Sequence, residues 1–469
     1  MPYLLGVDVG TTSMKAAVFD ENAALVASAV RDYTLTVSGD RVEFDPEGYW
    51  AMLKSVMEEL TATYPVAAMT IDTQCETMIV TDEAGTPLYP AIVWLDNRAA
   101  KQADRLREHF GEQRVYEITG QPEVTATWPA AKLLWLRQEE PEVFAGIRRV
   151  FLLEDWLLYK LTGRFVTEET LQSSTIYYDI HRHGWWQEML NYIGISPDQL
   201  PEVVPSGSVV GNYGGITVAA GVMDQIAGAI GAGVVEQGVI SEMTGTTMAI
   251  FIPTDAVPPY DPGSKVPCHL NYDGSYCLLM WSPTAGIALK WFRQQFCDTL
   301  GFRELDELAA AVAPGAAGLT FLPYLCGSAM PHYDPDARGV LWGLTMEHGR
   351  GHVARAIMES VACMLKQDLD YVGAGCSVIR TMGGAAKSPL WCQIKADVTG
   401  KTLTTLKTDE TACLGSAILA GVAIGIFPDV ETACRRAVAV DRIYTPSGAD
   451  YSECLSRYEA VDAKMWQNG

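Results

Sequence analysis

The chain begins with two apolar segments joined by a glycine-hydroxyl turn, and this pattern constrains its fold more than any other. Residues 4–9 predict a buried strand, residues 15–19 predict a second strand, and Gly10-Thr11-Thr12 lies in the turn between them. Such a turn lets backbone N–H groups and hydroxyls close on phosphate oxygens. Asp8, near the end of the first strand, is placed to orient Mg²⁺, which prefers oxygen ligands. Taken alone, the pattern also fits an ordinary hairpin with a surface aspartate.

A second copy of this pattern lies half a chain away. Residues 238–251 again read as strand, turn and strand, with Gly245-Thr246-Thr247 at the turn. Self-similarity within one chain is a fold-level signal, and it predicts two similar domains. If these domains face each other, each turn can bind one end of a triphosphate.

Length, charge and cysteine usage narrow the classes of function. A chain of 469 residues predicts two or three domains, and a formal net charge of −23 argues against binding to nucleic acid or to anionic membranes. We find no apolar run of roughly 18 residues and no secretory pattern at the N-terminus. The 11 cysteines are scattered without a C-x-x-C pair. We therefore expect reduced thiols in a cytoplasmic protein.

Alternating apolar and amphipathic segments predict an α/β fold. The expected helices cover residues 46–63, 98–110, 130–138, 284–296, 353–372, 390–398 and 414–424, with a terminal helix within 447–468. The expected strands include residues 67–73, 78–81 and 377–382. Because the stretch 207–238 is rich in glycine, we place the domain boundary there, with domains at 1–233 and 234–469.

Asp224 is the first candidate for catalysis. It ends an apolar strand and opens a segment of small residues that predicts a closely packed helix. In α/β proteins such a position projects into the crevice where ligands bind. Asp224 therefore suits a general base that takes a proton from a hydroxyl, and a plain helix N-cap is the alternative.

Polar side chains also follow two other predicted strands. Gln74-Cys75-Glu76 follows the strand at 69–73, and Trp94, Asp96 and Arg98 follow the run at 91–93. These side chains could surround a polyhydroxylated ligand, because recognition of hydroxyls needs directed polar partners. Core packing of Trp94 and a structural ion pair of Arg98 are the alternatives. A further turn, Gly383-Gly384-Ala385, lets the backbone approach a ligand closely.

The whole set of motifs resembles the FGGY family of carbohydrate kinases from residue 4 to about residue 426. Residues 127–139 are similar to the first family signature, apart from Thr127, where an aromatic, Met, Gly or Ser is usual. Residues 339–344 and 352–359 are similar to the second signature throughout. The resemblance implies two actin-like, ribonuclease-H-like domains, with ATP and a sugar in the cleft between them.

The resemblance also implies roles for individual residues. It implies that Asp224 is the catalytic base and that Asp8 lies beside Mg²⁺ and the transferred phosphoryl group. The residues implied for ATP are Gly10, Thr11, Thr12, Lys15, Thr244, Gly245, Thr246, Gly383, Gly384 and Ala385. The residues implied for the substrate are Cys75, Glu76, Trp94, Asp96, Trp128 and Gln225, beside the candidates Gln74 and Arg98.

Departures from the family pattern leave the sugar open. Residues 74–77 are similar to the Gln-Arg-Glu-Thr of glycerol kinases without its Arg, whereas xylulokinases usually carry Gln-Met-His-Gly. Asp224-Gln225 is also similar to glycerol kinases, while residues 90–94 and 282–286 are similar to xylulokinases. We expect a ketopentose such as xylulose first, a polyol such as glycerol or erythritol second, and gluconate last.

Two functions of other classes stay open at this point. One is an actin-like ATPase without sugar kinase activity, since fold does not determine function. Asp224, Glu76 and Trp94 argue against it, because an ATPase needs no pocket that recognises hydroxyls. The other is a sugar sensor without turnover, and the presence of both Asp8 and Asp224 argues against it. Whether the chain forms a homodimer also stays open.

Overall fold

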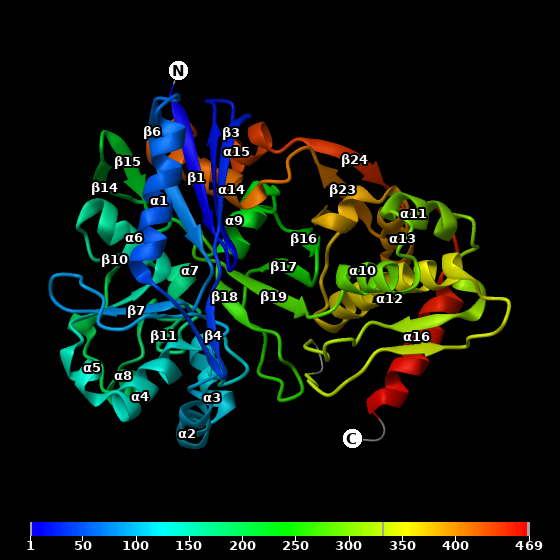
Figure 1. Ribbon diagram of the computed structural model, residues 1–469, viewed down its shortest axis with the longest axis horizontal. Coiled ribbons are helices and arrows are strands. Elements are labelled where there is room, and N and C mark those ends of the chain that lie inside the picture. Colours follow the sequence, from blue (N-terminus) through cyan, green and yellow to red (C-terminus); the bar gives the residue numbers. More distant parts are fainter. Residues whose placement is uncertain (1, 331–332, 467–469) are drawn as a thin grey trace.

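The computed structural model describes residues 2–330 and 333–466 and consists of two α/β lobes side by side (Figure 1). The first lobe is built on a six-stranded sheet, in the order β14 (Val209–Tyr213), β15 (Ile216–Ala219), β6 (Val66–Thr73), β1 (Tyr3–Val9), β2 (Ser13–Phe19) and β3 (Leu25–Asp32). The second is built on a seven-stranded sheet, in the order β18 (Cys268–Leu270), β19 (Tyr276–Ser282), β17 (Met248–Thr254), β16 (Val239–Thr244), β22 (Val378–Met382), β23 (Thr402–Leu406) and β24 (Val440–Tyr444).

The two sheets repeat one arrangement. β1 pairs antiparallel with β2 and parallel with β6. In the same way β16 pairs antiparallel with β17 and parallel with β22. Each antiparallel pair is joined by one of the two Gly-Thr turns, so the duplicated motif marks the same place in both sheets. The prediction of two similar α/β domains is confirmed.

The helices expected from the sequence form close to their expected positions. They are α1 (Pro46–Thr61), α2 (Ala100–Phe110), α4 (Pro129–Glu139), α10 (Gly286–Phe296), α12 (Arg350–Tyr371), α13 (Pro389–Thr399), α14 (Thr411–Ala423) and α16 (Ser452–Trp466). In α1, the Asp45 carboxylate accepts a hydrogen bond from the Glu47 N–H at 3.0 Å, and Pro46 occupies the first helical position. No helix within residues 2–330 and 333–466 is both long and apolar enough to cross a membrane.

The first lobe also contains a second, smaller sheet, of which the sequence predicted only the strands at residues 78–81 and 91–93. A second sheet joins β4 (Thr36–Ser38), β5 (Arg41–Phe44), β8 (Ala91–Ile92), β7 (Met78–Thr81) and β9 (Arg149–Leu152). Around it lie α3 (Glu112–Thr119), α5 (Pro141–Gly146), α6 (Leu153–Thr162), α7 (Glu169–Gln172) and α8 (Gln187–Ile193), with short pairs β10 (Val166–Glu168) with β13 (Glu202–Val204) and β11 (Tyr178–Asp179) with β12 (Gly184–Trp185). The second lobe adds α11 (Phe302–Ala310), α15 (Val430–Ala437) and the hairpin of β20 (Thr320–Leu322) and β21 (Val340–Trp342).

Two helices join the lobes by close backbone contact. The glycine-rich stretch is folded and contains β14, β15 and α9 (Asp224–Gly231). Helix α14, from the second half of the chain, packs against α9 and β1. A β-carbon added at Gly415 of α14 would lie 1.9 Å from the carbonyl oxygen of Ala227, and one added at Gly6 would lie 1.8 Å from that of Cys413. Only glycine permits this approach, which places α9 and the sheet end in one rigid unit.

Candidate active site

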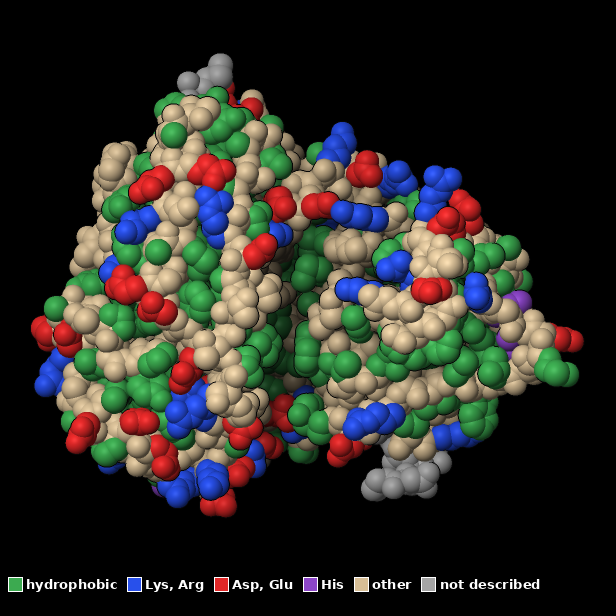
Figure 2. Space-filling model, viewed as in Figure 1, with side chains coloured by type: hydrophobic (Ala, Val, Ile, Leu, Met, Phe, Trp, Pro, Cys, Tyr) green, Lys and Arg blue, Asp and Glu red, His purple; other side chains and the backbone are tan. Residues whose placement is uncertain are grey.

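A groove runs between the two lobes (Figure 2). Three carboxyl groups gather where β1, β6 and α9 meet. Asp8 on β1 lies opposite Asp72 on β6 in the parallel register. Asp224 is the first residue of α9, and a bridge between Thr73 and Met223 brings that helix start to the end of β6. The sequence therefore placed Asp8 and Asp224 correctly at adjoining element ends.

The pKa of the Asp224 carboxyl group is shifted toward neutral pH. Burial and the neighbouring charge of Asp8 raise the pKa of Asp224 to about 7, and the Gln225 N–H opposes this rise by donating to Oδ1 at 2.7 Å. A general base works best when its pKa lies near the operating pH. The geometry thus suits proton transfer from a hydroxyl near neutral pH.

Asp8 has a second carboxyl beside it that sequence reasoning missed. Burial raises the pKa of Asp8 to about 6, while the Lys15 ammonium opposes the rise. Asp72 is completely buried, and the Ser416 hydroxyl donates to its Oδ2 at 2.6 Å. Among the described residues, Asp72 Oδ1 has no hydrogen-bond partner. The hydrophobic strand around Asp72 gave the only available signal, a carboxylate inside a buried apolar run.

These carboxyl groups fit Mg²⁺ only in part. Mg²⁺ is usually held by one or two carboxylates together with phosphate oxygens and water. In the part of the chain that the structure describes, no group of three or more His, Cys, Asp or Glu side chains could hold a metal ion. Asp8 and the orphaned oxygen of Asp72 therefore suit a Mg²⁺ ion that arrives with the nucleotide phosphates.

The first Gly-Thr turn contacts both the substrate side and the second lobe. The Trp94 indole N–H donates to the Thr11 hydroxyl at 3.0 Å. Lys15 Nζ lies 3.4 Å from the Glu410 Oε2 just before α14. Gly10 N–H bonds to the Ser13 carbonyl at 3.1 Å and closes the turn. Thr11 and Lys15 are thus held at the junction between the lobes, as a phosphate loop requires.

The threonine side chains of the second Gly-Thr turn lie in different surroundings. The Thr244 hydroxyl bonds to the Glu242 carboxylate and accepts from Lys395 Nζ at 2.8 Å, in a fully buried network. It therefore faces the core, and only the backbone of Thr244 can reach a phosphate. Gly245 N–H donates to the Thr247 carbonyl at 3.0 Å, and the exposed Thr246 and the half-buried Thr247 supply the other hydroxyls of this turn.

A cavity of about 750 Å³ adjoins this second turn, and its size suits a nucleotide. Thr244, Gly245, Thr246, Gly384 and Ala385 line it, as predicted. Residues that sequence reasoning missed also line it, among them Lys290, Phe302, Arg303, Asp306, Ser388, Trp391 and Arg442. They come from α10, α11, α13 and β24, which carry no recognisable motif and meet only in the folded lobe.

Gly383 shapes this cavity without lining it. Its φ is 78°, and an added β-carbon would lie 2.7 Å from the Thr244 carbonyl oxygen. Glycine alone fits both the backbone conformation and the close approach. The Gly383-Gly384 turn therefore packs directly against the second phosphate loop, as the predicted adenosine loop should.

A buried lysine stands at the predicted substrate side. Lys132 is completely buried in α4, and its Nζ donates to the Glu76 carbonyl at 2.7 Å. Glu76 has a positive φ of 56°, which an L-residue adopts only under constraint. Burial raises the pKa of Glu76 and lowers that of Lys132, while each charge favours the other. Lys132 lies in the first signature, yet sequence reasoning gave it no role.

A polar network from both lobes continues from Glu76. His269 on β18 is buried, and its Nδ1 lies 3.2 Å from the Ser173 hydroxyl and 3.3 Å from the Ser174 hydroxyl. Burial lowers the pKa of His269 to about 4, so the ring is neutral. Ser174 also contacts the side chains of Cys75 and Glu76. These residues were missed because β18 reaches the first lobe only through tertiary structure.

Other predicted substrate residues have structural partners. Arg98 pairs with the Asp96 and Glu43 carboxylates, both at 2.7 Å, and its side chain is 3% exposed. Asp96 Oδ2 also accepts from the Val42 N–H at 2.6 Å. Arg98 therefore forms the structural ion pair that was the alternative to sugar binding, and its partner is Asp96. This pair stabilises the loop that carries Trp94.

The three remaining substrate candidates, Gln74, Trp128 and Gln225, differ in how accessible they are to a ligand. The Gln74 amide donates to the Tyr49 hydroxyl at 3.2 Å and is buried. The Trp128 indole donates to the Glu123 carbonyl at 2.7 Å, and its ring is half-buried. Gln225 is half-buried beside Asp224. Trp128 and Gln225 thus keep surface for a substrate, whereas Gln74 supports the strand end.

Comparison with known proteins decides the family. Residues 3–240 match the N-terminal domain of the FGGY family of carbohydrate kinases, and residues 244–424 match its C-terminal domain. The chain belongs to the FGGY family. It is therefore a carbohydrate kinase, a phosphotransferase with an alcohol group as acceptor.

Individual relatives within the FGGY family carry different names. A xylulose kinase of Lactococcus lactis is 28% identical over 100% of this chain and 96% of its own length. A glycerol kinase of Trichlorobacter lovleyi is 32% identical over 92% of this chain and 91% of its own length. A gluconokinase of Bacillus subtilis is 28% identical over 90% of this chain and 88% of its own length. Structures of a xylulose kinase and of a gluconate kinase from Lactobacillus acidophilus each superpose on this chain with a TM-score of 0.92. Their sequence identities are 25% and 26%, and each comparison covers 100% of this chain and 99% of the other. The family is certain, and these identities do not separate the sugars.

Proposed function

We propose that this FGGY kinase transfers the γ-phosphoryl group of ATP to a primary hydroxyl of an open-chain ketose, with a ketopentose such as xylulose as the preferred acceptor. The observation that carries the proposal is Asp224, a carboxyl at the start of α9 whose pKa is raised to about 7 by burial and by the neighbouring Asp8. A pure ATPase would have no use for a base that accepts a proton from a sugar hydroxyl.

The chemistry follows from these positions. An Asp224 oxygen takes the hydroxyl proton while the sugar oxygen forms a bond to the γ-phosphorus. The bond from that phosphorus to the β–γ bridging oxygen breaks, and ADP leaves with the electron pair. Backbone N–H groups of both turns stabilise the charge on the phosphoryl oxygens. Asp8, supported by Asp72, would hold Mg²⁺, which supplies charge neutralisation on the β- and γ-phosphates when it is bound.

The substrate side supports a neutral acceptor longer than three carbons. Cys75 is a small, buried side chain where the resemblance to glycerol kinases calls for Arg, so the pocket has more room and one fewer cation. The only ammonium near Glu76 is that of Lys132, among the residues described, and it is already bonded to the Glu76 carbonyl. A carboxylate such as that of gluconate would therefore meet Glu76 without a free cation.

The decisive experiment compares acceptors by ADP release coupled to a reporter reaction. The acceptors are D-xylulose, L-xylulose, D-ribulose, erythritol, glycerol and gluconate, each with ATP and Mg²⁺. We expect the highest kcat/KM with a ketopentose. If glycerol or gluconate is best by a wide margin, the proposed substrate is wrong while the kinase activity stands. If no acceptor stimulates ADP release, the actin-like ATPase becomes the better proposal.

The role of Asp224 is tested with a matched pair of variants. Asp224→Asn removes the base and should lower kcat by at least about 100-fold, the scale that general-base catalysis supplies. Glu108→Gln removes a carboxylate from the exposed face of α2 and should leave kcat unchanged. Binding of ATP should persist in both variants. An Asp224→Asn enzyme with near wild-type kcat would overturn the assignment.

We further propose that the enzyme works in the cytoplasm. All 11 cysteines are free thiols, and ten of them are buried, which fits a reducing compartment. Localisation of a tagged full-length chain in its host would test this.

A further inference from the structure

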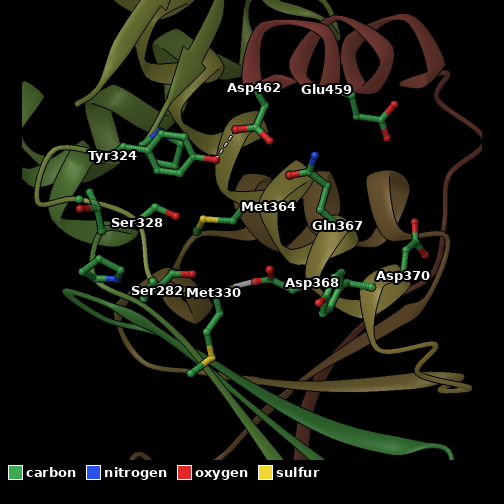
Figure 3. Close-up of a pocket in the computed structure, with 16 residues that line it drawn as sticks. Ser282, Tyr324, Ser328, Met330, Met364, Gln367, Asp368, Asp370, Glu459 and Asp462 are labelled. Atoms are coloured by element: carbon green, nitrogen blue, oxygen red, sulfur yellow. Dashed lines mark hydrogen bonds between the residues drawn. The ribbon is translucent and has the colours of Figure 1, made fainter. Parts of the chain in front are cut away.

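A separate cavity of about 260 Å³ lies in the second lobe, between α12, α16 and the segments 282–284 and 323–330 (Figure 3). It shares no lining residue with the nucleotide cavity. None of the residues to which we assign a part in phosphoryl transfer lines it. It is therefore a candidate for a second ligand.

The cavity is strongly acidic. Asp368 and Asp462 lie inside it, on opposite sides of Gln367, and the exposed Asp370 and Glu459 stand toward its mouth (Figure 3). No lysine or arginine is among the described residues that line it. Four carboxyl groups around one small space create a negative potential that attracts a cation.

Asp368 carries the observation that points to a ligand. Its side chain is 1% exposed, and Oδ1 has no hydrogen-bond partner among the described residues. Burial raises the pKa of Asp368 well above its ordinary value, and the nearby Asp462 raises it further. A buried carboxyl with an unpaired oxygen costs free energy, and a hydrogen-bond donor in the cavity would remove that cost.

Part of the remaining wall is apolar and polarizable, beside the polar Ser282, Thr284 and Ser328. Met330, Met364 and the ring of Tyr324 line it, and the Tyr324 hydroxyl donates to Asp462 Oδ1 at 2.5 Å. Thioethers and aromatic rings suit an alkyl chain or an organic cation better than a hydrated metal ion. The described residues also contain no group of three His, Cys, Asp or Glu with the geometry to hold a metal.

We propose that this cavity binds a small organic cation with a primary ammonium at each end, a short aliphatic diamine. One ammonium donates to Asp368 in the interior, the alkyl chain passes Gln367, and the second ammonium lies near the exposed Glu459 (Figure 3). The two ammonium groups of the diamine thus pair with two acidic side chains, the buried Asp368 and the exposed Glu459.

Titration calorimetry and thermal unfolding of the full chain with 1,4-diaminobutane test the proposal. We expect saturable binding at one site and a rise in Tm that follows the occupancy. Butane-1,4-diol, which has the same length without charge, should give neither signal. Potassium and magnesium chloride at equal ionic strength control for screening, because a chain with a net charge of −23 responds to any cation.

Variants separate this cavity from other acidic sites, including the cleft around Asp8. Asp368→Asn should weaken the binding of 1,4-diaminobutane at least about 10-fold, a loss expected when one charge-assisted hydrogen bond is removed. Gln367→Lys places an ammonium in the cavity and should abolish binding, while Gln367→Met should keep it. If Asp368→Asn does not fold, the Gln367 pair still decides.

Three results would overturn the proposal. The first is an equal rise in Tm with the diol or with the salts. The second is wild-type affinity in both Asp368→Asn and Gln367→Lys, which would place the diamine elsewhere. The third is no binding by the wild-type chain at millimolar diamine.

Discussion

The contact between α9 and α14 yields the sharpest quantitative prediction. A β-carbon added at Gly415 would lie 1.9 Å from the Ala227 carbonyl oxygen, whereas carbon and oxygen ordinarily approach to about 3.3 Å. Gly415→Ala must therefore separate the two helices by about 1.4 Å. Overpacking of this kind costs about 3 kcal/mol at the upper end of its usual range, because the obstacle is helical backbone that cannot rotate away.

The intrinsic preference of alanine for a helix partly offsets this cost. Alanine is about 1 kcal/mol better than glycine in a helix interior, so we expect a net loss of about 2 kcal/mol for Gly415→Ala. For a chain of 469 residues that unfolds as one unit, that loss lowers Tm by roughly 2 °C. Because α9 begins with Asp224, the displacement should also lower kcat about 10- to 100-fold.

Gly228→Ala is the matched control for this prediction. Gly228 also lies inside α9, and nothing lies within 4 Å of a β-carbon built there. The same substitution should therefore be neutral or stabilising by up to about 1 kcal/mol. Differential scanning calorimetry and the coupled kinase assay measure both variants. Equal Tm values for Gly415→Ala and Gly228→Ala would refute the close-contact reasoning.

Three further predictions concern the ionisable groups and the Trp94 contact. With wild-type enzyme, kcat/KM should fall about tenfold per unit below pH 7 and level off above it, because Asp224 accepts a proton only when ionised; a flat profile from pH 5 to pH 8 would contradict its role as base. Burial raises the pKa of Glu154 well above 4.5, so the folded state holds a proton that the unfolded state releases, and stability falls as the pH rises above that value. Glu154→Gln should therefore raise Tm more at pH 8 than at pH 5, and an equal change at both would argue against the shift. Trp94→Phe removes the hydrogen bond to Thr11 and should lower kcat/KM about 2- to 10-fold, the usual worth of one such bond, measured with the best sugar. An unchanged kcat/KM would show that this link has no part in catalysis.

Local chemistry explains which features could be predicted from the sequence. Turn residues, apolar periodicity and helix caps act over a few positions, so α1 and the two Gly-Thr hairpins form nearly where the pattern indicates. Asp8 and Asp224 could be found for the same reason, since each lies at the end of a strand or the start of a helix. The duplicated turn also predicted that the chain contains two similar sheets.

Contacts between distant segments explain what the sequence could not predict. Asp72 lies 64 positions after Asp8, and only the parallel pairing of β6 with β1 makes it a neighbour of Asp8. The sequence places Thr244 in the second Gly-Thr turn, but only the fold shows that its hydroxyl is buried beside Lys395, 151 positions away. Arg98 was weighed as a sugar ligand, yet burial next to Asp96 commits both charges to each other.

The sequence by itself therefore determined the α/β class, the duplication, the two Gly-Thr turns and the positions of Asp8 and Asp224 at element ends, because each is encoded by neighbouring residues. The tertiary structure decided the rest, because burial and partner choice are properties of the packed chain. It brought Lys132 and His269 to the substrate side and assembled the nucleotide cavity from four elements without motifs. It also left one oxygen of Asp368 unpaired in an acidic cavity that no spacing in the sequence indicates.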